Sequence, residues 1–119
     1  MGNYQKISMA YSCHNMVNPI KKIILKHPKD AFKDQETINK QVSRLNYFEV
    51  PNFNRAISDY DKFVSLLISF DIELHFLPKD NSTSIDSIYT HDPCVVSNNG
   101  VILCNMGKKS RLAEPNTME

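Results

Sequence analysis

The sequence has few glycines, almost no net charge and no long apolar run, and each lack excludes a class of protein. Three Gly and six Pro in 119 residues exclude a collagen-like or low-complexity chain. Fourteen basic and thirteen acidic side chains leave a formal net charge of +1, so no bulk field would attract nucleic acid or anionic lipid. The longest apolar stretch, residues 101–104, is too short for a membrane span or a signal-peptide core. The composition predicts one globular domain without nucleic-acid or membrane partners.

The chain also lacks the cysteine spacing of a disulfide scaffold. Its three cysteines are odd in number and far apart: Cys13, Cys94 and Cys104. Three free thiols in a sequence without a recognisable leader favour the reducing cytoplasm over a disulfide scaffold. The cysteines at 94 and 104 alternate with aliphatic residues, which is typical of small side chains buried in strands. A metal site built from His27, His75 and His91 is conceivable, but no two of them have local ligand spacing, so we predict no metal and no cofactor.

The first structured segment is predicted to be a strand. Residues 20–27 have a β-branched centre and end at Pro28. The three consecutive aliphatic residues 23–25 indicate burial on both faces, as in a parallel or mixed sheet. The charged residues 28–37 predict a surface loop, and the polar residues 1–19 predict a loose lead-in.

Two amphipathic helices are predicted to follow. Ile38, Val42 and Leu45 recur at steps of four and three residues, which predicts a short helix. A wider apolar stripe over residues 53–68, entered through Pro51-Asn52, predicts a longer helix.

The second half predicts a strand, a loop and a hairpin. Residues 72–78 alternate as a strand and residues 79–84 are a polar loop. Two apolar runs flank Asn98-Asn99-Gly100, and Asn-Gly favours a tight hairpin whose two central residues accept positive φ. A turn at 107–110 and the opening of another helix at 111–114 follow. That unfinished element favours equally a disordered tail or the front part of a longer protein.

The densest polar cluster is Asp-Ser-Ile-Tyr-Thr-His-Asp-Pro at residues 86–93. In a fully extended segment, Asp86 and Asp92 would lie roughly 20 Å apart at about 3.3 Å per residue. They can therefore serve one small ligand only if the segment bends. The plainer interpretation is that Asp86 caps a turn and that Asp92 bonds its own loop.

A second polar segment, Gly107-Lys108-Lys109-Ser110, does not fit the phosphate-loop pattern, which needs an earlier glycine and a Ser or Thr directly after its lysine. Its two lysines and Arg111 are typical of a solvated turn. An arginine there can still bind a carboxylate through a bidentate pair of hydrogen bonds.

Several of these segments together resemble a known family. The segments are Asn46-Tyr47 through Arg55-Ala56, Tyr60-Asp61-x-Phe63, Glu-Leu-His-Phe-Leu-Pro at 73–78, residues 86–93, and Met-Gly-Lys-x-x-Arg-x-x-Glu at 106–114. From about residue 20 to residue 115 the chain resembles the first part of amidinotransferase-like, dimethylarginine dimethylaminohydrolase-like proteins. The resemblance implies an α/β pentein propeller of five modules around a central site, of which this chain would supply about two. It also implies chemistry on guanidino groups, in which a cysteine attacks the guanidinium carbon and forms a covalent intermediate.

The resemblance implies substrate-binding roles for four residues. Asp92 resembles the carboxylate that binds the substrate guanidinium, and Asp86 the one nearer the substrate amino group. Arg111 resembles the arginine that grips the substrate carboxylate. His91 stands where many dimethylarginine hydrolases have Glu, while arginine deiminase-like relatives have a basic residue there.

The catalytic histidine and cysteine of the family lie in a later part of its members, and no cysteine of this chain matches the nucleophile. We therefore predict the substrate-binding N-terminal part of a guanidino-modifying enzyme, inactive alone, marginally stable and prone to aggregate. One alternative is a non-enzymatic module that binds an arginine-like ligand or a partner chain, a second copy included. Another is a small α/β protein without a ligand.

Overall fold

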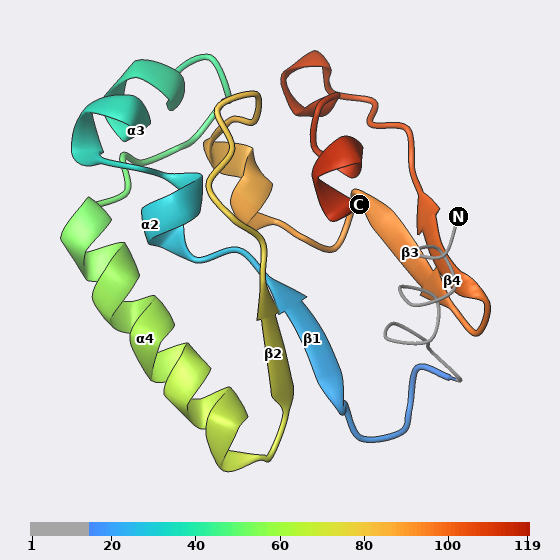
Figure 1. Ribbon diagram of the computed structural model, residues 1–119. Helices are drawn as coiled ribbons and strands as arrows, with labels where there is room; N and C mark the ends of the chain where they lie inside the picture. The colour runs from blue at the N-terminus through green and yellow to red at the C-terminus, as the bar shows by residue number, and fades with distance from the viewer. Residues whose placement is uncertain (1–14) are drawn as a thin grey trace.

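The computed structural model describes residues 15–119 as a mixed α/β unit with two separate two-stranded sheets (Figure 1). In chain order the elements are β1 (Lys22–Leu25), α2 (Pro28–Ala31), α3 (Gln35–Gln41), α4 (Phe53–Ser69), β2 (Glu73–Phe76), the 3-10 helix η1 (Ile85–Ile88), β3 (Cys94–Ser97), β4 (Gly100–Leu103), and the 3-10 helices η2 (Lys109–Arg111) and η3 (Pro115–Met118). Neither sheet closes on itself within the described residues. Cys13 and most of the expected lead-in lie outside them. No helix in residues 15–119 has the length and apolar character needed to cross a membrane.

The first sheet confirms the strand expected at residues 20–27. β1 pairs in parallel with β2, in a register that runs from Lys22 opposite Glu73 to Leu25 opposite Phe76. The expectation that both faces are buried is wrong for most of the strand, because only Leu25 is buried and the two isoleucines before it are half-buried. A strand with one hydrogen-bonded neighbour has too little structure around it to be covered completely.

The surface loop expected at residues 28–37 is instead two helical segments. Pro28 opens α2, where its missing N–H costs nothing, and the His27 side chain accepts a bond from the Lys29 N–H at the start of that helix. The charges of this segment mask a short apolar face, since Ala31 and Phe32 are buried.

The core lies where α2, α3 and η1 meet. Its buried members are Ala31, Phe32, Ile38, Val42, Leu45 and Ile85. The short helix expected around Ile38 is confirmed as α3, with Asp34 accepting a bond from the Thr37 N–H as its N-cap. Because Ile85 is fully buried, the segment that carries Asp86 is anchored to this core.

The long helix is also confirmed. α4 begins after Asn52, whose side chain accepts a bond from the Arg55 N–H, and it ends before Asp71, which has a φ of 57°. The apolar stripe is only partly covered. Leu67 is buried, whereas Phe63 and Ile68 are exposed.

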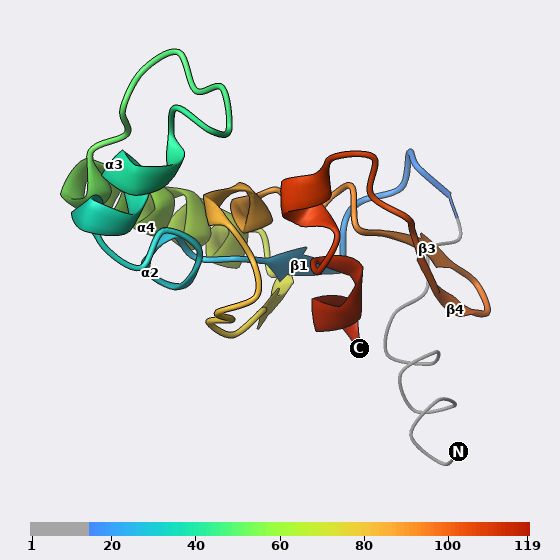
Figure 2. The ribbon, with the colours of Figure 1, turned by 90° about the horizontal axis from the view of Figure 1, so that it is seen from above.

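The hairpin is confirmed, but its turn lies one residue earlier than expected. β3 and β4 pair antiparallel with Ser97 opposite Gly100, so the two turn residues are Asn98 and Asn99. Of residues 97–100, only Gly100 has a positive φ, 129°, and Gly100 is the first residue of β4. The turned view places this hairpin at the end of the molecule away from α3 and α4 (Figure 2).

The α-helix expected to open at residues 111–114 is replaced by the short 3-10 helices η2 and η3. Arg111 and Glu114, three residues apart, pair with each other. Side chains three residues apart lie in line along a 3-10 turn, so this pairing suits the tighter geometry.

Candidate functional site

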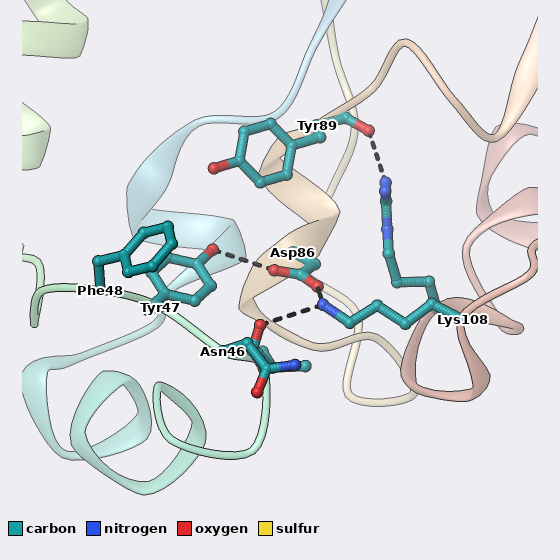
Figure 3. Close-up of a pocket in the computed structure, with 8 residues that line it drawn as sticks. Asn46, Tyr47, Phe48, Asp86, Tyr89 and Lys108 are labelled. Carbon is teal, nitrogen blue, oxygen red and sulfur yellow. Dashed lines mark hydrogen bonds and ion pairs between the residues drawn. The ribbon is translucent and has the colours of Figure 1, made fainter.

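A cavity of about 350 Å³ lies between the loop that follows α3, the turn η1 and the segment that leads into η2 (Figure 3). This volume is within the range of small-molecule sites. The residues that line it are Leu45, Asn46, Tyr47, Phe48, Asp86, Tyr89, Lys108 and Arg111. Two of the four residues that the family resemblance singled out, Asp86 and Arg111, therefore face one cavity.

Asp86 is a buried carboxylate with a partner on each oxygen. Its Oδ1 accepts a hydrogen bond from the Tyr47 hydroxyl at 3.1 Å, and its Oδ2 accepts from Lys108 Nζ at 2.8 Å. Figure 3 shows the two partners reaching Asp86 from different sides. The expectation that Asp86 merely caps a turn is wrong, because Ser84 caps η1 and the Asp86 side chain bonds distant parts of the chain.

The Tyr47 phenol is held in its protonated form. Burial raises the pKa of Tyr47 above its ordinary value, and the negative charge of Asp86 and the neighbouring Tyr89 raise it further. Tyr47 is thus a neutral hydrogen-bond donor to Asp86, which leaves Lys108 as the cation in contact with this carboxylate.

Arg111 is the second cation of the site, and three groups hold it. Its Nε and Nη2 donate to the buried Glu114 carboxylate, its Nη1 donates to Asp92 at 2.7 Å, and its Nη2 also donates to the Tyr89 carbonyl at 3.0 Å. The bonds to Glu114 and then to Asp92 raise the pKa of Arg111 above its already high value. Within residues 15–119, one of the two Nη1 hydrogens has no bonding partner.

The segment between the two aspartates is bent rather than extended, because η1 turns the chain after Asp86. Asp92 does not line the cavity, but it pairs with Arg111, which does. The expectation that Asp92 only bonds its own loop is therefore wrong. His91 is exposed and is not among the residues that line the cavity.

Six of the eight residues that line the cavity were not recognised as site residues from the sequence, among them Tyr47, Tyr89 and Lys108. The solvated turn expected from Lys108, Lys109 and Arg111 is correct for the two lysines, which are exposed, although the Lys108 ammonium pairs with Asp86. It is wrong for Arg111, whose side chain is 11% exposed. Both tyrosines lie in segments that carry the family resemblance, which was a usable signal. Lys108 also lies in such a segment, the motif at 106–114, but nothing in the sequence indicates that its ammonium pairs with Asp86, which is 22 residues away.

Other candidate groups do not form a site. No group of three or more His, Cys, Asp and Glu within residues 15–119 has the arrangement to hold a metal ion. His27 contacts Asp61 and His75 contacts Glu73. Burial raises the pKa of the half-buried Cys94 thiol, which is opposite to the lowered pKa of an activated nucleophile.

Comparison with known proteins gives a family and a fold. The sequence profile of a family described as N,N dimethylarginine dimethylhydrolase, eukaryotic, matches residues 27–119. A crystal structure of a dimethylarginine dimethylaminohydrolase adduct with 4-chloro-2-hydroxymethylpyridine is similar in fold, with a TM-score of 0.63 and 20% sequence identity. The alignment covers 84% of this chain and 35% of that one, so this chain spans about a third of its structural relative. No curated protein matches the chain. The family resemblance drawn from the sequence motifs is thereby confirmed.

Proposed function

Because the chain belongs to the N,N dimethylarginine dimethylhydrolase family, a pentein-type family, we propose that it forms the substrate-binding part of a guanidino-modifying enzyme. In this proposal residues 20–119 contribute about two of the five modules of a pentein propeller, and the cavity beside η1 takes an arginine-like ligand. Membership of a hydrolase family favours hydrolysis over transfer to a second amine. The observation that carries the proposal is that one cavity is lined by the buried Asp86 carboxylate and by two cations, Lys108 and Arg111. Arg111 in turn pairs with Asp92 and Glu114 behind it.

The charges of the site suit a ligand with a cation at one end and an anion at the other. Asp86, Asp92 and Glu114 outnumber Lys108 and Arg111 by one negative charge. A guanidinium is planar and pairs well with carboxylate acceptors, and a carboxylate pairs well with an arginine fork. The site therefore complements arginine or a methylated arginine, both of which carry a net positive charge.

The Asp92–Arg111 pair, which is exposed only on its Asp92 side, is the ion pair that such a ligand would separate. Half of the Asp92 side chain is exposed, so that carboxylate loses little when it exchanges Arg111 for a ligand guanidinium. Glu114 would keep Arg111 in place, and the Nη1 hydrogens of Arg111 would then face the ligand carboxylate. His91, exposed beside Asp92, would leave the entrance without the second carboxylate that many dimethylarginine hydrolases have there.

The chain alone is expected to bind but not to turn over its ligand. The family mechanism needs an activated thiol. Neither Cys94 nor Cys104 lines the cavity, and the pKa of Cys94 is raised rather than lowered. Incubation of the purified chain with arginine or dimethylarginine should release no citrulline, and measurable release would contradict this assignment.

Isothermal titration calorimetry with arginine and asymmetric dimethylarginine tests the binding proposal. Asp92→Ala and Arg111→Ala should each weaken binding by about tenfold or more, because each removes a charge-assisted pair with the ligand. Asp59→Ala, which removes an exposed aspartate on α4 away from the cavity, is the matched control and should bind as the unmodified chain does. A folded chain that binds neither compound would overturn the proposal.

A further inference from the structure

The two cations of the cavity are held in different ways. Arg111 is fixed by the buried Glu114, and its side chain is 11% exposed. Lys108 has one charged partner, Asp86, and its side chain is 43% exposed. Its other bond, 3.2 Å to the Leu45 carbonyl, is to a neutral group. Lys108 can therefore leave the cavity for solvent far more easily than Arg111 can.

Asp86, by contrast, cannot easily be left without a cation. Its side chain is 5% exposed, and its second partner is the neutral Tyr47 hydroxyl. A buried carboxylate that loses its counter-charge is left with a desolvation penalty that nothing compensates. Departure of Lys108 is thus coupled to the arrival of another cation at Asp86 Oδ2.

We propose that Lys108 is the resident counter-cation of Asp86, and that an amino group of the ligand displaces it on binding. This inference rests on the proposed function, because it assigns the amino end of the same arginine-like ligand to Asp86. The displaced ammonium moves to solvent while its flexible stem stays at the mouth of the cavity. Lys108 acts as an internal competitor: it lowers the affinity for ligands with a primary amino group and does not affect ligands without one.

The competition makes an unusual prediction, because removal of a cavity residue should tighten binding. In Lys108→Met no tethered ammonium competes with the amino group of arginine for Asp86. The affinity of the variant for arginine should therefore rise by about tenfold or more. δ-Guanidinovalerate has the guanidinium and the carboxylate of arginine but no amino group. Its affinity should change less than about threefold.

Calorimetry of the 119-residue chain with these two compounds is the primary test, and Lys109→Met, which removes the neighbouring exposed lysine, is the matched control. Tighter binding of arginine alone, in Lys108→Met alone, supports the inference. If the unmodified chain binds arginine while Lys108→Met binds it equally or more weakly, the inference is overturned and the proposed function stands. If no variant binds either compound, both are overturned.

A measurement without ligand tests the same role of Lys108 if a variant folds too poorly for calorimetry. Lys108→Ala should unfold at a lower temperature than the unmodified chain, and methylammonium chloride should restore part of the loss, since a small cation can replace the lost ammonium at Asp86. Tetramethylammonium chloride at the same ionic strength has no N–H to donate and should not restore it. The double variant Asp86→Asn/Lys108→Ala should gain nothing from methylammonium. Equal effects of both salts, or the same rescue in the double variant, would overturn the role of Lys108 as counter-cation.

Discussion

Tyr47 links the stability of the molecule to alkaline pH. In the unfolded chain its phenol ionises near pH 10, whereas burial and the charge of Asp86 raise the pKa of the folded phenol. Below pH 10 both states keep the proton. Above pH 10 the unfolded state binds fewer protons, so the free energy of unfolding falls as the pH rises, by up to about 1.4 kcal/mol per pH unit for this group.

Tyr47→Phe tests this contact at the residue scale. At pH 7 the variant loses a hydrogen bond to a charged group, which should lower the free energy of unfolding by about 2 kcal/mol. Above pH 10 its free energy of unfolding should fall less steeply than that of the unmodified chain. Urea titrations monitored by circular dichroism at several pH values measure both effects. Burial also raises the pKa of Tyr60 and lowers the pKa of Lys26. Both groups are present in the variant and in the unmodified chain, so they do not cause a difference between the two pH profiles. If the free energies of unfolding of the two chains fall in parallel above pH 10, the raised pKa of Tyr47 is contradicted.

Individual site residues could be recognised from the sequence only where a motif carried them. Asp86, Asp92 and Arg111 stand in segments that resemble a family, and the structure brings Asp86 and Arg111 to one cavity. Lys108 stands in one of the same segments, but its role could not be recognised, because its partner is distant in sequence and a lysine beside a turn is normally solvated. The pairing of Arg111 with Asp92 was equally hidden, since residue type gives a charge but not a direction.

At the scale of single elements, the N-cap of α4 is a local contact with a measurable contribution. The Asn52 side chain accepts a bond from the Arg55 N–H at 2.9 Å. Asn52→Ala should lower the free energy of unfolding by about 1 kcal/mol, because one of the first N–H groups of the helix loses its acceptor.

The matched control for this cap is Asn54→Ala, which removes an exposed asparagine inside the same helix. Alanine has the higher helix propensity, so the control should be neutral or slightly more stable. Chemical denaturation of the two variants compares them directly. A loss of equal size in both would show that the Asn52 side chain does not cap the helix.

Long or strongly patterned elements were predictable, and short ones were not. The seventeen residues of α4 repeat their apolar pattern several times, and a hairpin turn is specified by a few adjacent residues. α2 has only four residues, so no period can develop, and its buried Ala31 and neighbouring Phe32 are masked by charges. Its formation depends on Pro28, the His27 cap and the core formed with η1, of which the last contact is tertiary.

At the scale of the whole molecule, both sheets have edges that no other strand within residues 15–119 pairs, and the outer hairpin carries exposed apolar side chains. Val95 and Ile102 stand opposite each other on β3 and β4, and each is more than half exposed. Unpaired strand edges and exposed apolar side chains both favour association with another chain. A pentein propeller made of several modules would cover such edges with neighbouring modules, whereas residues 15–119 leave them open.

Self-association through this hairpin should therefore increase with concentration, and one added charge should reduce it. Ile102→Lys places an ammonium in the centre of the exposed apolar pair, where docking of another strand would bury it at high cost. Asn98→Lys adds the same charge in the turn of the same hairpin, outside the apolar pair, and serves as the control. Sedimentation velocity over a range of concentrations should show less association for Ile102→Lys than for Asn98→Lys. Equal association of the two variants would mean that the molecule associates through another surface, or that net charge alone governs the effect.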